Sequence, residues 1–331
     1  MMRNLCILPH LEAHPRITVL DPVACMLHDG RVAMGVDSAL RSGILASLDD
    51  LLASLELRPL GGDRFAVPAE TTLMFDRIYG GSLLAQALVG AAATVEGKGP
   101  QSLHANFLRP GEPGRPLEVV VDRIRDGRSM VTRQVSVLQE DARLLIGVVS
   151  FHDNSGEPDV TGPPPEVSPP AEVPLLQTWA NELPPELRAR GRHWIERPPA
   201  LEMRIPEAPA FLGGGHAGAA RSHWMRLPRP VGSDDVLHAA LLAYASDFFL
   251  MDMIFRAHPL ELGPRNANGF SCDHAIWFHR PVRFDRWHLH TQEAVALVGE
   301  RGLASGAIHD LEGHLAASVM QEVVVRPRPP R

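Results

Sequence analysis

The sequence has few cysteines, one lysine and no long apolar run, and each shortage excludes a class of protein. Its 331 residues include only Cys6, Cys25 and Cys272, which are far apart and odd in number. This pattern offers no disulfide framework and no zinc-ligand spacing, and it fits a reducing compartment. No stretch reaches the roughly 18 uninterrupted apolar residues that a membrane-spanning helix needs. We therefore expect no membrane span.

Charge and targeting signals further limit the possible partners and cellular locations. The net charge is −7, which argues against a nucleic-acid partner, because such proteins are normally basic. Lys98 is the only lysine, so nearly all positive charge is arginine. The N-terminus makes a poor signal peptide and the C-terminus is no peroxisomal address, so we expect a cytoplasmic location. No Gly-x-Ser-x-Gly motif marks a nucleophile, and no cofactor is indicated.

The chain divides at a proline-rich stretch. Residues 1–42 show no sustained hydrophobic period, and Met34 is an alternative start, whereas a helical pattern begins at Ile44. Between residues 153 and 174 seven prolines rule out a helix or a central strand and indicate an extended linker. We expect a poorly ordered N-terminal extension at 1–42, a first domain at 43–152, a linker at 153–190 and a second domain at 191–331.

The two halves repeat the same pattern. Each has an apolar helix, over residues 80–93 and 235–254, followed by four strand-like runs, the first of which ends in Arg-Pro. The Arg-Pro pairs at 109–110 and 280–281 lie the same distance apart as Leu144 and Leu315, so the repeat keeps its register. The pairs at 126–127 and 312–313 are typical of hairpin turns.

Both helices are apolar nearly all round, and such a helix must be enclosed by other elements. One long buried helix wrapped by an antiparallel sheet describes the hotdog fold. The sequence therefore predicts an α+β protein with two tandem hotdog domains, each an antiparallel sheet around a long central helix. The alternative, two unrelated α+β domains, does not explain the shared register.

An acid stands out in the second helix. Asp247 is surrounded by apolar residues, and a carboxylate there is costly to bury unless it is paired or used. When the helices are aligned on their Leu-Leu-Ala triplets, Val89 lies opposite Asp247. The alternative interpretation is that Asp247 caps or hydrogen-bonds a local backbone group.

Further polar candidates lie on the strands of the second half. By alternation Gln321 shares the core-facing side of the last strand, where the matching position of the first half is Ser150. A lone amide there is more often structural, but Asp247 on the enclosed helix provides a partner. Ser271 opens an earlier strand and is a weak signal. His288 and His290 form a His-x-His pair that we interpret as solvent-exposed.

With these residues in view, the sequence resembles the acyl-CoA thioesterase II (TesB-like) family from about residue 44 to the C-terminus. The motifs that carry the resemblance are YGGSLLAQAL, SLHANFLRPG and RIRDGRSMVTRQV in the first half, and LLAYASD, DHAIWFHRP, RGLASG and ASVMQE in the second. Two positions depart from the family: Ser271, where Thr is frequent, and Ser82, where Gln commonly follows the paired glycines.

The resemblance implies hydrolysis of acyl-CoA to free acid and CoA, by water that Asp247 activates as general base and that Ser271 and Gln321 orient. It implies an acyl-CoA partner, and we expect a homo-oligomer that binds neither a metal ion nor a cofactor. Two alternatives stay open: a hotdog hydratase or dehydratase, which needs an Asp–His pair that His274 or His279 would provide, and a non-catalytic acyl-CoA-binding protein. Expected substrate contacts are Gly80, Gly81, His104, Arg128 and Arg280, with Arg109 as a further phosphate candidate.

Overall fold

A computed structural model describes residues 38–68, 73–74, 77–153, 158–215, 218, 220–260, 262–263 and 266–328. Most of the extension expected at residues 1–42 thus lies outside the described residues. The helical pattern expected from Ile44 begins earlier, because α1 spans Ser38–Leu55 and includes the last residues of that interval.

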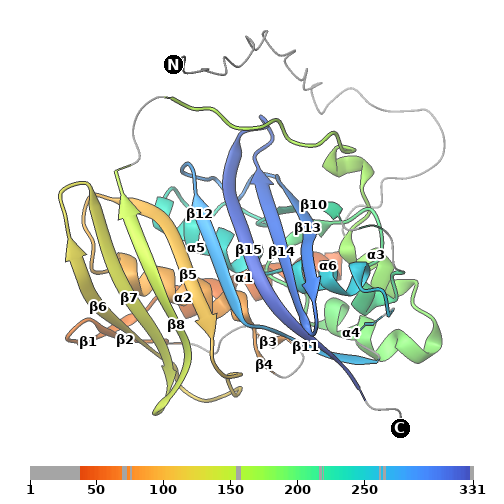
Figure 1. Cartoon of the computed structure of the whole chain (residues 1–331), viewed down its shortest axis with the longest axis horizontal. Coiled ribbons are helices and arrows are strands. Elements are labelled where there is room, and N and C mark those ends of the chain that lie inside the picture. The colour runs from red at the N-terminus through yellow and green to blue at the C-terminus, as the bar shows by residue number, and fades with distance from the viewer. Residues whose placement is uncertain are drawn as a thin grey trace, which may run out of the picture. The chain divides into compact units, whose positions relative to one another are not determined.

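The long strands of both halves belong to one antiparallel sheet (Figure 1). The halves meet where β5 (Gly99–Phe107) pairs with β12 (Asp273–Phe278). From this junction the order runs β5-β8-β7-β6 in one direction and β12-β15-β14-β13 in the other, so the two repeats are arranged alike about the junction. The remaining strands are β6 (Glu118–Asp126), β7 (Met130–Gln139), β8 (Ala142–His152), β13 (His288–Val298), β14 (Arg301–His309) and β15 (Leu315–Pro327).

Shorter strands extend the sheet at its ends. On the first-half side these are β2 (Arg64–Ala66) and β1 (Arg58–Gly61), and on the second-half side β10 (Ala220–Arg226) and β9 (Glu202–Arg204); β11 (Ala267–Ser271) pairs with β15, and β3 (Leu73–Met74) with β4 (Arg77–Ile78) separately. The hairpin turns expected at residues 126–127 and 312–313 are confirmed, because they join β6 to β7 and β14 to β15.

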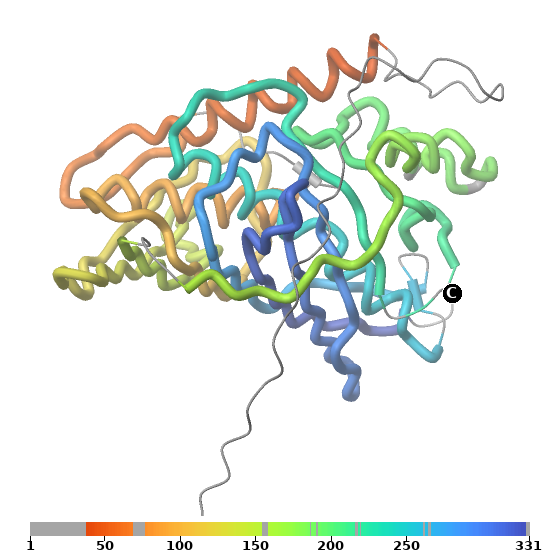
Figure 2. Tube along the Cα trace, turned by 90° about the horizontal axis from the view of Figure 1, so that it is seen from above, coloured from red at the N-terminus to blue at the C-terminus, as the bar shows by residue number. Residues whose placement is uncertain are grey.

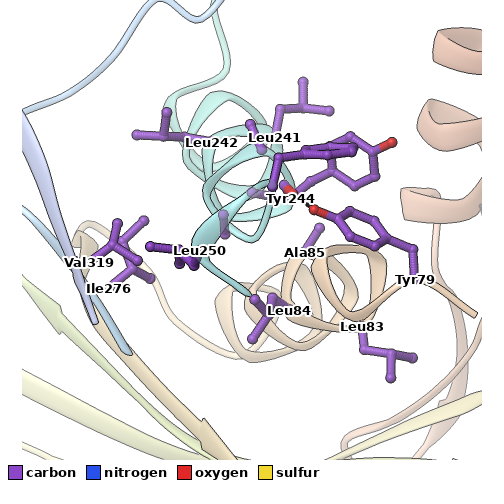
Figure 3. Close-up of a cluster of buried hydrophobic side chains, with 14 of the residues drawn as sticks. Tyr79, Leu83, Leu84, Ala85, Leu241, Leu242, Tyr244, Leu250, Ile276 and Val319 are labelled. Carbon is purple, nitrogen blue, oxygen red and sulfur yellow. Dashed lines mark hydrogen bonds between the residues drawn. The ribbon is translucent and has the colours of Figure 1, made fainter. Parts of the chain in front are cut away.

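The helices lie on one side of the sheet, with α1 beyond them (Figure 2). The central helix of the first half is α2 (Gly80–Ala92), and that of the second is α5 (Asp235–Ser246). Both are almost wholly buried, as their apolar circumference requires. Figure 3 shows them side by side, with Ile276 and Val319 of the sheet facing them. The α+β class with hotdog units is therefore confirmed.

The second helix is broken, contrary to the continuous helix expected over residues 235–254. α5 ends at Ser246 and α6 (Leu250–Ala257) begins only after Phe249, whose φ of 70° lies in the left-handed region. A non-glycine residue rarely adopts that conformation, and such strain is frequent at functional sites. Residues 235–257 together are long and apolar enough to cross a membrane, but 83% of the most apolar window is buried inside the protein.

The proline-rich stretch leads into a small helical segment. The described part of it is extended up to the 3-10 turn η1 (Pro170–Glu172). The segment then forms α3 (Leu176–Asn181), η2 (Pro185–Leu187), α4 (Arg188–Glu196) and η3 (Ala210–Leu212). Because α4 supplies the buried Trp194 and η3 the partly buried Phe211 to the second half, this segment bears on the site. The domain boundaries stay a prediction.

Candidate active site

A cavity of about 1220 Å³ opens where the two halves meet the helical segment. Its wall combines the start of α2, the end of β5, the break between α5 and α6 and the strand β11 with Gln321 of β15 and Arg328 just after that strand. Asp247, Ser271 and Gln321 all line this cavity, so the structure brings the three expected catalytic residues together.

Asp247 sits in the helix break as the C-terminal cap of α5. Its side chain is 8% exposed, and burial raises the pKa of the carboxyl to about 6. Two hydrogen bonds oppose this rise, one from the side chain of Gln321 and one from the backbone N–H of Gly81. Asp247 is thus neither fully paired nor exposed, and its pKa suits a proton acceptor near neutral pH.

The paired glycines at the start of α2 permit this arrangement. A Cβ at Gly80 would lie 2.8 Å from Oδ2 of Asp247, and a Cβ at Gly81 would lie 2.3 Å from the carbonyl oxygen of Tyr244. Only glycine therefore lets the first turn of α2 approach the end of α5 so closely. The helix N-terminus also favours a negative charge at this point.

Ser271 and Gln321 hold each other on the sheet side of the cavity. Ser271 ends β11, and Nε2 of Gln321 on β15 donates to its Oγ at 2.6 Å. Gln321 is buried and faces the helices, as strand alternation predicts.

His274 lies directly behind this pair. Its Nδ1 is 2.6 Å from Oε1 of Gln321, and its Nε2 is 2.8 Å from Oγ of Ser246. The ring is buried, and desolvation lowers its pKa to about 4, so it is neutral at pH 7. It is absent from the described lining of the cavity. Sequence reasoning considered His274 only as half of an Asp–His pair; its Nδ1 is 3.9 Å from Oδ1 of Asp247.

The expected match between Ser150 and Gln321 is wrong by one residue. Both last strands carry a bulge, at Leu144 in β8 and at Ala316 in β15, so Ala316 and not Leu315 corresponds to Leu144. The counterpart of Gln321 is then Val149, which is buried. A one-residue slip moves every side chain of a strand to the other face.

Several other expected contacts lie away from the cavity. Gly80 lines it, but His104 is exposed on β5 against the ring of Trp277, and Arg128 is exposed in the turn after β6. Arg280 donates to the carbonyl of Leu315 and pairs with Asp159, and it does not line the described cavity either.

Three other arginines line the cavity instead. They are Arg77, Arg109 and Arg328, all of them exposed. Within the described ranges, no carboxylate forms an ion pair with any of the three. Only Arg109 had been named from sequence. Arg77 just before the paired glycines gave no signal of its own, and Arg328 is one of several arginines in a proline-rich tail.

An aromatic wall forms the apolar side of the cavity. Trp194 from α4 stacks on Phe211 from η3, with ring centroids 4.7 Å apart, and Phe211 stacks on Phe249 at 5.8 Å. Tyr79 and Phe248 complete this wall, with centroids 4.7 Å apart. Sequence reasoning missed Trp194 and Phe211, because no periodic signal marked their contact with the helix break.

The His-x-His pair is buried, so the expectation of solvent exposure is wrong. His288 and His290 both face the core of the second half. Burial lowers the pKa of His290 to about 3, which keeps it neutral. Among the residues that the structure describes, no cluster of three or more His, Cys, Asp or Glu side chains could hold a metal ion.

Comparisons with known proteins match both halves. Residues 193–324 match the family described as Acyl-CoA thioesterase, and residues 69–152 match the family described as Acyl-CoA thioesterase N-terminal domain. Acyl-coenzyme A thioesterase 8 of Homo sapiens is 32% identical over 83% of this chain and 88% of its own length. Acyl-CoA thioesterase 2 of Haemophilus influenzae is 31% identical over 85% of this chain and 94% of its own length.

Comparison with solved structures indicates the same family. An acyl-CoA thioesterase II (TesB2) from Mycobacterium marinum is 30% identical, with a TM-score of 0.68, over 84% of this chain and 98% of its own. The tesB protein of Mycobacterium avium subsp. paratuberculosis is 29% identical, with a TM-score of 0.67, over 86% and 100%. On identity, coverage and fold together, the chain belongs to the acyl-CoA thioesterase II family of thioester hydrolases.

Proposed function

We propose that this protein hydrolyses acyl-CoA thioesters to free fatty acid and CoA with a water molecule that Asp247 activates. The observation that carries the proposal is the meeting of Asp247, Ser271 and Gln321 on one cavity, where burial raises the pKa of Asp247 to about 6. A base with such a pKa is ionised at neutral pH, yet it accepts a proton more readily than an exposed aspartate.

In this proposal Gln321 and Ser271 orient the water, and Asp247 accepts its proton. Nε2 of Gln321 already donates to Oγ of Ser271, so the serine hydroxyl proton is free to turn toward a water oxygen or toward Asp247. A water between Asp247 and Ser271 is held with its lone pair toward the thioester carbon. Such positioning contributes by removing orientational freedom before the reaction.

The reaction then proceeds by addition and elimination. The water oxygen bonds to the carbonyl carbon while Asp247 takes its proton, and the carbonyl oxygen becomes negative. The N-terminus of α2 at Gly80 lines the cavity and supplies the partial positive charge that favours this oxyanion. Collapse breaks the carbon–sulfur bond, and the proton passes from Asp247 to the CoA sulfur. A thiol with a pKa of about 8.5 leaves with little assistance.

The charges of the cavity suit the two ends of an acyl-CoA. Arg77, Arg109 and Arg328 gather exposed positive charge, which favours the phosphate groups of CoA. The aromatic wall of Trp194 and Phe211 favours the acyl chain. We infer that the thioester carbon lies between these regions, beside Asp247.

A hydratase or dehydratase is the second candidate, because His274 lies 3.9 Å from Asp247. That chemistry needs a histidine that faces the substrate. His274 instead contacts protein atoms at both ring nitrogens, and no histidine is among the described residues that line the cavity. Hydrolysis therefore fits the arrangement better.

The test is CoA release from decanoyl-CoA and palmitoyl-CoA, measured with a thiol reagent. We expect wild-type protein to release CoA, and Asp247→Asn to lower kcat by about 100-fold or more with acyl-CoA binding retained. Binding is measured separately by calorimetry. If Asp247→Asn keeps its activity within threefold of wild type, Asp247 is not the base. If wild-type protein binds both substrates without releasing CoA, it is a binding protein.

A further inference from the structure

We propose that His274 is a positioning residue that fixes the amide of Gln321, so that Nε2 of Gln321 points at Asp247 and Ser271 while Oε1 points away from the cavity. This inference rests on the proposed function, because it concerns how the water-binding group is held. It assigns a role to a buried histidine that the hydrolytic mechanism above does not use.

The hydrogen bonds around Gln321 admit one orientation when Asp247 is ionised. Its Nε2 donates to Oγ of Ser271 at 2.6 Å, and its side chain also donates to Asp247. A carboxylate only accepts, so both N–H groups of the amide are used on the cavity side. Oε1 is then left facing Nδ1 of His274 at 2.6 Å, and that nitrogen must carry a proton.

The surroundings of His274 are compatible with this tautomer. The ring is buried and neutral, so only one nitrogen is protonated. Nε2 lies 2.8 Å from Oγ of Ser246, whose single proton has a second acceptor in the carbonyl oxygen of Ala243 at 2.9 Å. Because the bonds of Gln321 require a proton on Nδ1, Nε2 is the acceptor, and the Ser246 hydroxyl donates to His274 and not to Ala243. Ser246 immediately precedes Asp247, so the proposed base and the hydroxyl partner of His274 lie together at the C-terminal end of α5.

The first repeat shows which residues occupy the equivalent positions where the His274–Gln321 pair is absent. The strand registers equate His274 with Leu103, and Gln321 with Val149. Leu103 and Val149 are paired neighbours and are both buried. Packing alone therefore accepts two apolar side chains here. The second repeat has two polar groups that satisfy each other, and packing does not explain that choice.

Loss of the His274 donor frees the amide. Rotation by 180° about the terminal bond of Gln321 would turn Oε1 toward the Asp247 carboxylate and withdraw the donor from Ser271. The water site would then lack a fixed orientation. The effect falls on kcat, because His274 lies outside the described lining of the cavity and does not face the substrate.

Two replacements separate the donor from the ring. His274→Leu removes the N–H with little loss of volume. His274→Asn keeps an N–H donor, because its side-chain amide nitrogen is attached to Cγ as Nδ1 of histidine is. We expect His274→Leu to lower kcat about 10-fold or more, while KM stays within about twofold of the wild-type value. We expect His274→Asn to restore kcat to within about threefold of wild type. The assay is CoA release from decanoyl-CoA.

His238 provides a matched control. It is also fully buried in the second half, and protein groups also meet both of its ring nitrogens, the carbonyl of Gly232 and the N–H of Phe284. It does not line the described cavity. His238→Leu should lower the melting temperature and leave the kcat of the folded protein unchanged, which separates positioning from structural damage.

The pH profile gives a second readout. The bond from Gln321 lowers the pKa of Asp247 against the effect of burial, so His274→Leu should move the acid limb of kcat to higher pH. His274→Asn and His238→Leu should not move it. The titratable groups that interact with Asp247 are Tyr79 ahead of α2 and His274 on β12, while His290 on β13 faces His274. None of these is expected to change charge between pH 5 and 8.

The outcomes are decisive. If His274→Leu folds, keeps kcat within threefold of wild type and leaves the acid limb of the pH profile unshifted, the role of His274 is overturned. It is also overturned if His274→Leu and His274→Asn lower kcat equally. Asp247→Asn is measured alongside, and if that variant stays active the proposed function itself fails. Should His274→Leu not fold, imidazole ¹⁵N spectra of wild type, assigned by comparison with His274→Asn, decide the matter. A proton on Nδ1 supports the proposal, and a proton on Nε2 overturns it.

Discussion

Replacing the proposed base should make the protein more stable while it makes it inactive. Burial raises the pKa of Asp247 from 3.8 to about 6, so the folded state disfavours the charged carboxylate. At about 1.36 kcal/mol for each tenfold change in acidity, this corresponds to about 3 kcal/mol of unfolding free energy lost at neutral pH. Asp247→Asn removes this cost, because asparagine has no charged form.

Because the pKa of Asp247 is higher in the folded state than in the unfolded state, its effect on stability depends on pH. Between about pH 4 and pH 6 the folded state keeps a proton on Asp247 that the unfolded state has released. Stability therefore falls as pH rises through this window and levels off above pH 6. We expect Asp247→Asn to gain about 3 kcal/mol over wild type at pH 8 and about 1 kcal/mol at pH 4.5. Urea unfolding at both pH values measures the two differences.

Asp252 is the matched control. It lies five residues further along the chain, in α6, and burial raises the pKa of its carboxyl too. Its Oδ2, however, is 2.8 Å from Nη1 of buried Arg221, and its Oδ1 accepts from the N–H of Ala210. Asp252→Asn should lower stability by about 3–5 kcal/mol, because it leaves Arg221 without its counter-charge. The reasoning is refuted if Asp247→Asn is less stable than wild type at pH 8, or if its gain is the same at both pH values.

Four further expectations follow from the same geometry. The kcat of wild-type protein should fall about tenfold per pH unit below about pH 6, as the base becomes protonated; a flat profile down to pH 5 contradicts this. Arg109→Ala should raise KM for acyl-CoA severalfold, whereas Arg280→Ala, which is paired elsewhere, should not; equal effects contradict the phosphate assignment. Gln321→Ala should lower kcat about 10-fold or more, whereas Ser150→Ala should be nearly silent, and turnover assays of the folded variants compare them. A chain that starts at Met34 retains α1 and should melt and hydrolyse as the full chain does; a large fall in melting temperature contradicts this.

The sequence predicted the fold because its signals were long and repeated. Two apolar helices and two sets of strands in the same register left little choice of architecture. The break at Asp247 was not predicted, since periodicity reports which residues are apolar and not whether the backbone continues. Phe249 at a φ of 70° has no residue-type signal, because left-handed backbone normally favours glycine or asparagine.

Single residues were predictable only where they contradicted their surroundings. Asp247 and Gln321 stood out as polar groups on apolar faces, and both line the cavity. Arg77, Trp194 and Phe211 are ordinary residues in their own segments. Their place on the cavity depends on how distant segments meet, and no local pattern encodes that meeting.

The one-residue error at Ser150 had a physical cause with a consequence for the site. Both repeats carry the bulge, so the bulge does not shift the match. The extra residue lies in the turn before β15, where residues 310–314 separate His309 from its partner Leu315, whereas residues 139–142 separate Leu138 from its partner Arg143. With Val149 as the counterpart of Gln321, the polar group replaces an apolar core residue. Ser150, in contrast, is partly exposed. The site is thus built into the core and not at the surface.

A core site of this kind works only as a complete set. Either His274 or Gln321 alone, opposite the apolar partner that the first repeat has, would leave a buried polar group unsatisfied, at a cost of about 1–3 kcal/mol. Together they satisfy each other, and Ser246 and Ser271 satisfy their outer atoms. Buried polar networks are favourable when every member is paired and unfavourable when one is missing. The rigidity that the proposed water site requires and the all-or-none character of the network therefore have the same physical origin.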